Sequence, residues 1–177
     1  MPPTWTLPEY LERKRVLVDA YREQLRQPEA APAPLRAVVS VAAGSGVRPI
    51  RMRDFLVTTD AGAPIGGYGL GPTAPELLLG ALASCLAHSA VVIAADHKMP
   101  IEQLEVEVTG QLDYRGTLAV EATATVPPTK LAYQLRVSGP LSDQDLARLH
   151  ADLEQLCPVL LALTQPTAVS GQIERVG

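Results

Sequence analysis

The most apolar region of the chain begins at residues 71–85, Gly71-Pro72-Thr73-Ala74-Pro75-Glu76-Leu77-Leu78-Leu79-Gly80-Ala81-Leu82-Ala83-Ser84-Cys85. Pro72 and Thr73 suit the entry to a helix, and the apolar run that follows predicts a helix over about 74–96. Apolar residues cover every side of this helix, so we expect a globular fold to bury it. Cys85 lies in it, and Cys157, the second of two cysteines, lies far along the sequence. Any partnership of the two thiols therefore depends on the fold.

The same helix has the length of a membrane span. Its alanine content and the polar residues Glu76, His88 and Ser89 argue against that interpretation. A strand-like alternation follows at 104–108, which does not fit a lone membrane anchor. We therefore predict the core helix of a soluble protein and no membrane partner.

Composition narrows the function further. A net charge of −4 and a pI near 5.4 argue against nucleic-acid binding, which needs a dense basic surface. Residues 1–9 lack the basic and apolar regions of a signal peptide. Two cysteines without a secretory signal indicate a reducing compartment, and we predict a cytoplasmic protein. In that setting a structural disulfide is not expected, but a transient catalytic one is permitted.

The chain divides into an arm and a main domain. Residues 8–27 have helical spacing of apolar residues between charges, and their apolar stripe needs a docking surface such as a partner subunit. Residues 28–34 form a Pro/Ala linker, which is stiff and extended. We predict an N-terminal helical arm and linker over 1–34 and one domain over 35–177.

The main domain has the pattern of an α+β protein with an antiparallel sheet. Its predicted strands are 35–43, 50–59, 102–113, 117–126, 131–138 and 168–176, with possible extended pairing at 65–68. Gly44-Ser45-Gly46 predicts a hairpin turn, and 114–116 a second turn. Ser142 to Asp145 resembles a capping box that begins another helix, which Pro158 then breaks or restarts.

A reactive thiol in an apolar helix needs a cation or hydrogen-bond donor directed at it, because burial disfavours the thiolate. Arg51 and Arg53 are candidates, since alternate residues of a strand share a face. Their alternative role is a solvated strand face. His88 stands three residues after Cys85 and could act as a base, although a packed or capping histidine is the simpler interpretation.

Three further residues have open alternatives. Glu76 lies in the first helical turn, where the helix dipole alone explains a carboxylate. Cys157 precedes Pro158, so it could be a helix N-cap with a lowered thiol pKa, or simply a small apolar residue. A metal site built from Cys85, His88, His150 and Cys157 is disfavoured because structural zinc ligands cluster more tightly. We expect no metal or other cofactor.

Residues 71–85, the segment Leu104-Glu105-Val106-Glu107-Val108-Thr109-Gly110 and Cys157-Pro158-Val159 together resemble the OsmC/Ohr family of osmotically inducible and organic-hydroperoxide-resistance proteins. The resemblance spans about residues 35–176. It implies an intertwined homodimer, with a strongly curved six-stranded antiparallel sheet wrapped around long central apolar helices. In the organic-peroxidase branch a glutamate follows Asn-Pro ten residues before the cysteine. Pro75 holds that position here, so the pattern is more similar to the OsmC-like branch.

The resemblance also implies a chemistry. Cys85 would attack an organic hydroperoxide and become a sulfenic acid, and Cys157 would condense with it to a disulfide. Arg53 or Arg51 would hold the thiolate, with Glu76 fixing the arginine. A dithiol, such as dihydrolipoyl groups, would restore the thiols. The alternative is a non-enzymatic dimer of the same fold that binds an apolar ligand or partner while the cysteines merely pack.

Overall fold

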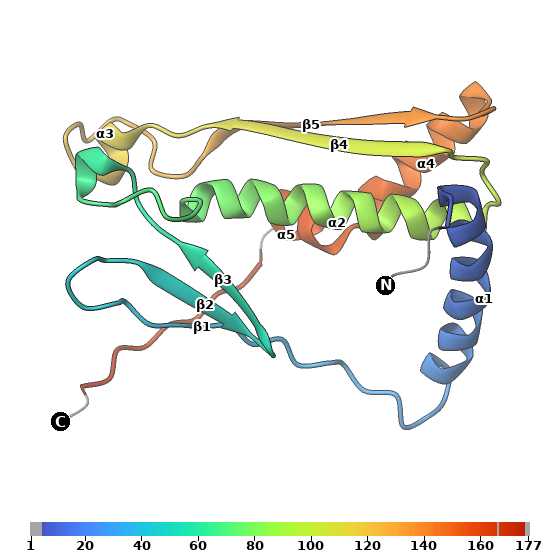
Figure 1. The fold of residues 1–177 in the computed structure, drawn as a ribbon, viewed down its shortest axis with the longest axis horizontal. Coiled ribbons are helices and arrows are strands. Elements are labelled where there is room, and N and C mark those ends of the chain that lie inside the picture. The colour runs from blue at the N-terminus through green and yellow to red at the C-terminus, as the bar shows by residue number, and fades with distance from the viewer. Residues whose placement is uncertain (1–4, 166, 176–177) are drawn as a thin grey trace. The chain divides into compact units, whose positions relative to one another are not determined.

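The computed structural model describes residues 5–165 and 167–175 of the chain (Figure 1). These residues form two compact units. The first takes in the chain up to Arg15, then Ser84–Glu105, and the chain from Arg136 onward. The second takes in Val16–Ala83 and Val106–Leu135. The long helix and two long strands therefore contribute residues to both units.

Helix α2, Ala74–Asp96, has the bounds predicted for the central apolar helix. In the first unit it supplies much of the core, including the fully buried Leu86, Ala90 and Ala94. Among the described residues it is the one helix long and apolar enough to cross a membrane, a test that core helices of soluble proteins also pass. Only 33% of its most apolar stretch is buried within the described residues, so the expected burial on every side is not found in this chain.

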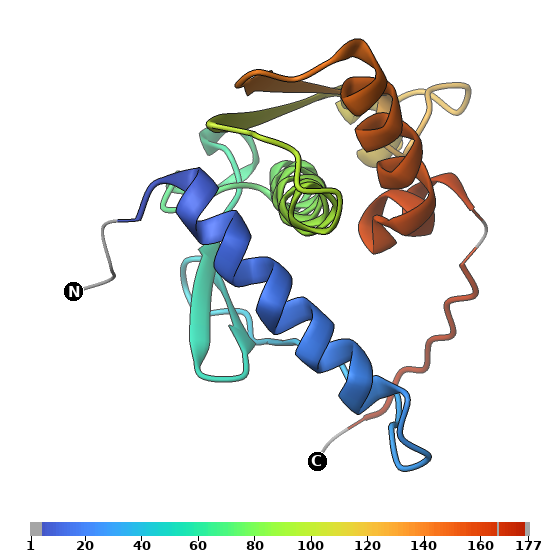
Figure 2. The same ribbon diagram turned by 90° about the vertical axis from the view of Figure 1, so that its right-hand side faces the viewer.

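Helices α4, Asp143–Leu156, and α5, Pro158–Thr164, belong to the same unit as the second half of α2. Figure 2 looks along α2 and shows both helices beside it. Leu149 and Leu153 of α4 are buried, as expected from their helical spacing. The predicted capping box is present, because Ser142 and Asp145 bond each other's backbone N–H.

The arm forms helix α1, Leu7–Leu25, close to the predicted range. Its first half belongs to the first unit, where Leu11 is buried. Its second half carries a set of exposed large apolar residues, Val16, Leu17, Tyr21 and Leu25. A helix face of this kind is usually covered by another surface.

The second unit contains a three-stranded antiparallel sheet in the order β1-β2-β3. The strands are β1, Val38–Val39, β2, Arg48–Met52, and β3, Phe55–Thr59. The predicted turn at 44–46 joins β1 to β2. The predicted single strand over 50–59 is wrong, because Arg53 and Asp54 form a turn that pairs Met52 with Phe55.

Strands β4, Gln103–Gln111, and β5, Thr129–Ser138, are hydrogen-bonded neighbours in a two-stranded sheet. The predicted strand over 117–126 is wrong, and helix α3, Tyr114–Thr117, with a loop takes its place. The carboxylate of Asp113 caps α3 by accepting the backbone N–H of Arg115, and the Arg115 side chain binds Asp113 and Glu121. These local bonds compete with strand pairing.

A tight loop precedes α2, and buried Asp60 organises it. Its carboxylate accepts backbone N–H bonds from Ala61 at 2.8 Å, Tyr68 at 3.0 Å and Leu70 at 3.1 Å. The loop contains the 3₁₀ helix η1, Ala63–Ile65. It therefore does not contain the extended pairing considered at 65–68.

The last described segment, 167–175, contains no strand, although alternation predicts one over 168–176. Residue 176 of that range lies outside the described residues. Val169 is 90% exposed and Ile173 is fully exposed. A strand exists only through pairing with a neighbour, and within the described chain this segment has no neighbouring strand.

Candidate functional site

The two free cysteines lie in the first unit and contrast in exposure. Cys85 lies about three turns into α2 and is half-buried. Cys157 is 0% exposed, and it is both the C-cap of α4 and the N-cap of α5. Pro158 at the first position of α5 confirms the predicted helix restart with Cys157 as N-cap.

The fold brings the Cys157 thiol close enough to Cys85 to act on the ionisation of its thiol. Two other groups also act on the Cys85 thiol, the backbone N–H of Val159 and the hydroxyl of Ser89. Burial raises the pKa of the Cys85 thiol, and the neighbouring Cys157 thiol raises it further. The donors at Val159 and Ser89 act in the opposite direction, but the pKa remains above its ordinary value. The neutral thiol is therefore the resting form near neutral pH.

Sequence reasoning missed both Val159 and Ser89. Ser89 could have been found from its spacing, because residues four apart on a helix lie on the same face. Val159 could have been found from Pro158, which has no N–H, so that the next residue supplies the first amide of α5. Neither signal points to a thiol until the fold places Cys85 beside the start of α5.

His88 lies one turn after Cys85 and is exposed. Partial burial lowers the pKa of His88, and the positive charge of Lys14 on α1 lowers it further. Within the described part of the chain, no hydrogen bond joins His88 to Cys85. The histidine is therefore neutral at pH 7 and stands beside the site.

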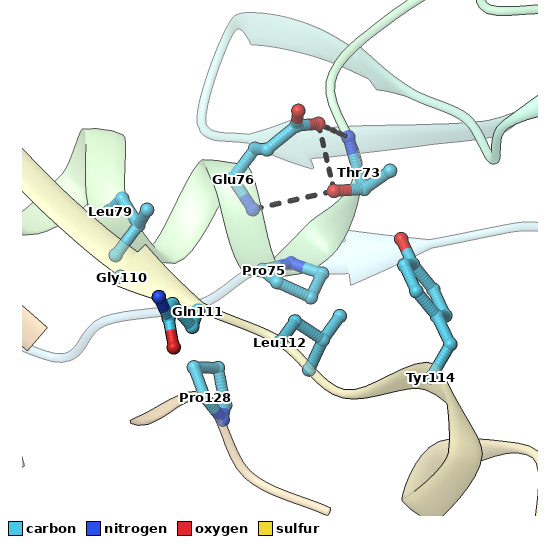
Figure 3. Close-up of a pocket in the computed structure, with 9 residues that line it drawn as sticks. All are labelled: Thr73, Pro75, Glu76, Leu79, Gly110, Gln111, Leu112, Tyr114 and Pro128. Atoms are coloured by element: carbon cyan, nitrogen blue, oxygen red, sulfur yellow. Dashed lines mark hydrogen bonds between the residues drawn. The ribbon is translucent and has the colours of Figure 1, made fainter. Parts of the chain in front are cut away.

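Glu76 forms a capping box at the start of α2. Its Oε2 atom accepts the backbone N–H of Thr73 at 2.7 Å and the Thr73 hydroxyl at 2.8 Å, and Figure 3 shows these bonds. The Thr73 hydroxyl in turn accepts the Glu76 N–H at 3.4 Å. The bonds from Thr73 lower the pKa of Glu76. The carboxylate is thus ionised and already committed to a helix cap.

The same end of α2 borders a cavity of about 190 Å³ in the second unit. The residues that line this cavity are mainly apolar. They include Pro75, Leu79, Leu112, Tyr114 and Pro128 (Figure 3). The Glu76 carboxylate turns toward Thr73 and away from Pro128 (Figure 3). The cavity therefore has the chemistry to accept a small apolar group.

Arg51 and Arg53 belong to the second unit and are exposed. Arg51 lies in β2, but Arg53 lies beyond its end with a φ of 54°, in the turn to β3. The argument that both residues share a strand face is therefore wrong, because the alternation ends at Met52. The Arg53 guanidinium lies 5.1 Å from the centre of the Phe55 ring.

Among residues 5–165 and 167–175, no group of three or more His, Cys, Asp or Glu side chains gathers as a metal site would require. His150 contributes to an ion pair with Glu154 along α4, with 3.7 Å between Nε2 and Oε1. The fold thus places the two free cysteines near each other. His150 instead contacts the carboxylate of Glu154.

Fold and site define the class of protein. The family model described as OsmC-like protein matches residues 67–170, so the chain belongs to the OsmC-like family. No curated protein sequence matches the chain. Solved structures share the fold at low sequence identity.

An OsmC-like protein from Mycoplasma pneumoniae is 16% identical with a TM-score of 0.65, covering 76% of this chain and 89% of that one. A Psychrobacter arcticus protein named for osmotic stress induction and detoxification response is 18% identical with a TM-score of 0.58, covering 73% and 88%. An organic hydroperoxide resistance protein OsmC from Legionella pneumophila is 18% identical with a TM-score of 0.54, covering 75% and 91%. These similarities establish the α+β fold of the family.

Proposed function

We propose that this protein is a thiol-dependent peroxidase that reduces organic hydroperoxides with Cys85 and Cys157. The proximity of the two thiols carries the proposal, because a sulfenic acid on Cys85 would form beside a second thiol. Membership of the OsmC-like family and the hydroperoxide-resistance name of the Legionella pneumophila neighbour support a peroxide-related function.

In the proposed reaction the Cys85 thiolate attacks the terminal oxygen of the hydroperoxide. The O–O bond breaks, the alcohol leaves with a proton, and Cys85 becomes a sulfenic acid. The Cys157 sulfur then attacks the Cys85 sulfur, a disulfide forms, and water leaves. A dithiol, such as dihydrolipoyl groups, reduces the disulfide by exchange and is itself oxidised to a disulfide.

The partly exposed sulfur is the one suited to meet the substrate. Cys85 is half-buried, whereas Cys157 is inaccessible to solvent, so we assign the first step to Cys85. It lies on the most apolar helix of the chain, and an apolar surface favours alkyl hydroperoxides over hydrogen peroxide by about 0.8 kcal/mol per buried methylene. Arg53 or Arg51 would stabilise the thiolate, and Glu76 would orient the arginine.

The assembly proposed for this chemistry is an intertwined homodimer with a strongly curved sheet around the central helices. The unpaired segment 167–175 with exposed Val169 and Ile173, and the exposed apolar face of α1, support an assembly in which a second copy covers them. We further propose an arm and linker over 1–34, a domain over 35–177, and a cytoplasmic location.

A second function has its own support. The raised pKa of Cys85 opposes a permanently ionised thiolate. The Glu76 carboxylate already accepts hydrogen bonds from Thr73, which opposes a role for Glu76 in orienting an arginine toward that thiolate. The apolar cavity near Pro75 and Leu79 offers a place for an apolar ligand. The alternative is therefore a non-enzymatic dimer of the same fold that binds an apolar ligand or partner.

The two functions differ in a simple titration. Reduced protein is mixed with a small excess of cumene hydroperoxide, and free thiols are counted over time. The peroxidase predicts the loss of two thiols per chain with one equivalent of alcohol formed. Retention of both thiols over the same period, in protein that remains folded, would instead support the binding function.

A further inference from the structure

Two hollows of the second unit share part of their lining. One is the apolar cavity of about 190 Å³ described above, and the other is a polar hollow of about 500 Å³. Gln111 and Leu112 line both of them. Gln111 is the last residue of β4, and Leu112 leads on toward α3, so the shared lining lies where the strand ends. One ligand can therefore contact both hollows.

The apolar cavity offers mainly hydrocarbon to a ligand. Its polar residues Thr73 and Glu76 hydrogen-bond to each other at the start of α2, as Figure 3 shows, so neither side chain depends on a ligand for a partner. An apolar cavity of about 150 Å³ can stay dry and bind benzene. The cavity of about 190 Å³ therefore has room for one aromatic ring or a short alkyl group of similar size.

The polar hollow contains charges that are already paired with one another. Apart from Leu112, its lining consists of Gln111, Asp113, Arg115, Thr125 and Thr129. The Arg115 guanidinium binds the carboxylate of Asp113 at 2.6 Å and that of Glu121 at 3.0 Å. Hydrogen bonds between Arg115 and Asp113 lower the pKa of Asp113 and raise that of Arg115, so both groups are charged near neutral pH.

The neutral polar side chains of this hollow are the ones without a partner. Within the described chain, the side-chain amide of Gln111 and the hydroxyls of Thr125 and Thr129 form no hydrogen bond. The loop that carries Thr125 packs directly on α3, because a Cβ atom on Gly116 would lie 2.5 Å from the Thr125 carbonyl oxygen. The hollow therefore has a closely packed wall with neutral donors and acceptors to offer.

We propose that the apolar cavity and the polar hollow form one binding site for a small neutral amphiphile. Its aromatic or short alkyl end would occupy the cavity, and its hydroxyl or amide end would bond to Gln111, Thr125 or Thr129. A charged end group fits less well, because its loss of water is not offset by an unpaired opposite charge. The inference goes beyond the peroxidase reaction, since it uses neither cysteine, and it names a ligand class for the second function.

The test is a titration of isotope-labelled full-length protein with benzyl alcohol at pH 7, followed by the NMR shifts of backbone amides. We expect saturable shifts at Leu79, Gln111 and Leu112 that fit one Kd. Benzoate and benzylammonium carry the same ring with a charged end, and they should bind about tenfold more weakly. Tighter binding of either ion, or no saturable shift with benzyl alcohol because a second copy covers the hollows, would overturn the inference.

A hydroxyl deletion tests the polar end of the site. Thr129→Val replaces the hydroxyl with a methyl group and suits a strand. It should weaken benzyl alcohol binding about fivefold, the value for one neutral hydrogen bond, and leave the binding of toluene unchanged. Thr109→Val makes the same change at an exposed position of β4 outside both hollows, and it should bind both probes as wild type does.

A larger side chain tests the apolar end. Leu79→Phe should fill the cavity and abolish the binding of both probes. Leu78→Phe is the matched control, because the preceding residue of α2 is directed about 100° away and lines neither hollow. If Leu79→Phe fails to fold, Thr129→Val still decides, since toluene binding reports its intact cavity. Unchanged benzyl alcohol binding in Thr129→Val and Thr125→Val together would overturn the inference.

The titration uses no peroxide, so the site and the proposed functions fail separately. Benzyl alcohol binding together with the loss of two thiols to cumene hydroperoxide would retain both the site and the peroxidase. Retention of both thiols without benzyl alcohol binding would remove the peroxidase and this site.

Discussion

The Cys157 thiol acts on the Cys85 thiol and raises its pKa, although the two residues come from α2 and from the junction of α4 and α5. One sulfur is partly open to solvent and the other is buried. This asymmetry gives the two cysteines different expected behaviour toward an oxidant, and it leads to the first prediction.

Cys157→Ser should stop the proposed reaction after its first step. The sulfenic acid on Cys85 would then have no neighbouring thiol, so dimedone should trap it at one adduct per chain. Intact-mass measurement after cumene hydroperoxide treatment checks this. Cys85→Ser is the matched control and should give no adduct, because buried Cys157 is inaccessible. Adducts on Cys157 in that control would reverse the assigned order.

Removal of the α2 capping box should cost stability. Thr73→Ala deletes the hydroxyl but keeps the Glu76 carboxylate, whereas Glu76→Gln deletes the charge. We expect each to lower the free energy of unfolding by about 0.5–2 kcal/mol, measured by urea denaturation. The comparison also tests the proposed role of Glu76 toward an arginine. That role requires Glu76→Gln to lose far more peroxidase activity than Thr73→Ala. Equal losses would mean that Glu76 acts only as part of the helix cap.

Asp60 should make the loop before α2 sensitive to acid. Hydrogen bonds from Ala61 and Leu70 lower the pKa of Asp60, so the carboxylate binds protons less readily in the folded chain than in the unfolded chain. The resulting stability is full above the ordinary aspartate pKa of about 3.9 and is lost as pH falls through the lower folded value.

Melting temperatures of wild type and Asp60→Asn between about pH 2 and pH 7 check this. The variant should be less stable near pH 6, and the difference should shrink as pH falls below about 4. Amide hydrogen exchange at Tyr68 and Leu70 should be faster in the variant, because both amides bond to this carboxylate. A pH-independent difference in melting temperature would contradict the prediction.

The C-terminal segment should affect assembly more than the stability of one chain. Val169 and Ile173 are almost fully exposed, so Val169→Asp with Ile173→Asp removes no packing within the described chain. If a second copy pairs with this segment, the double variant should elute later in size-exclusion chromatography at the same concentration. Ser170→Asp with Gln172→Asp, which adds the same charges at neighbouring positions, serves as the control.

The sequence was most informative where local rules act alone. The bounds of α2, the Ser142 capping box and the restart at Pro158 all follow from apolar pattern and helix-end chemistry. The prediction of a strand over 117–126 was wrong because Arg115 forms local ion pairs with Asp113 and Glu121, which the alternation of apolar residues does not reveal.

The prediction that Arg53 shares a strand face with Arg51 was wrong for a related reason. Arg53 itself adopts a left-handed conformation, and the strand ends before it. The contact of Cys85 with Cys157 could be suspected only through family resemblance, because spacing along the chain carries no information about it. Ser89 and Val159 were missed because their importance exists only relative to that contact. The roles of Arg51, Arg53 and Glu76, and the division at residue 34, stay predictions.

Cys157 is the single residue between two helices, the C-cap of α4 and the N-cap of α5. A covalent bond from this residue to Cys85 would anchor the backbone of both α4 and α5 to the central helix at a single point. Oxidised chains should consequently resist proteolysis in their C-terminal third better than reduced ones. The rate of proteolysis would then report whether the disulfide has formed, without a measurement of enzymatic activity.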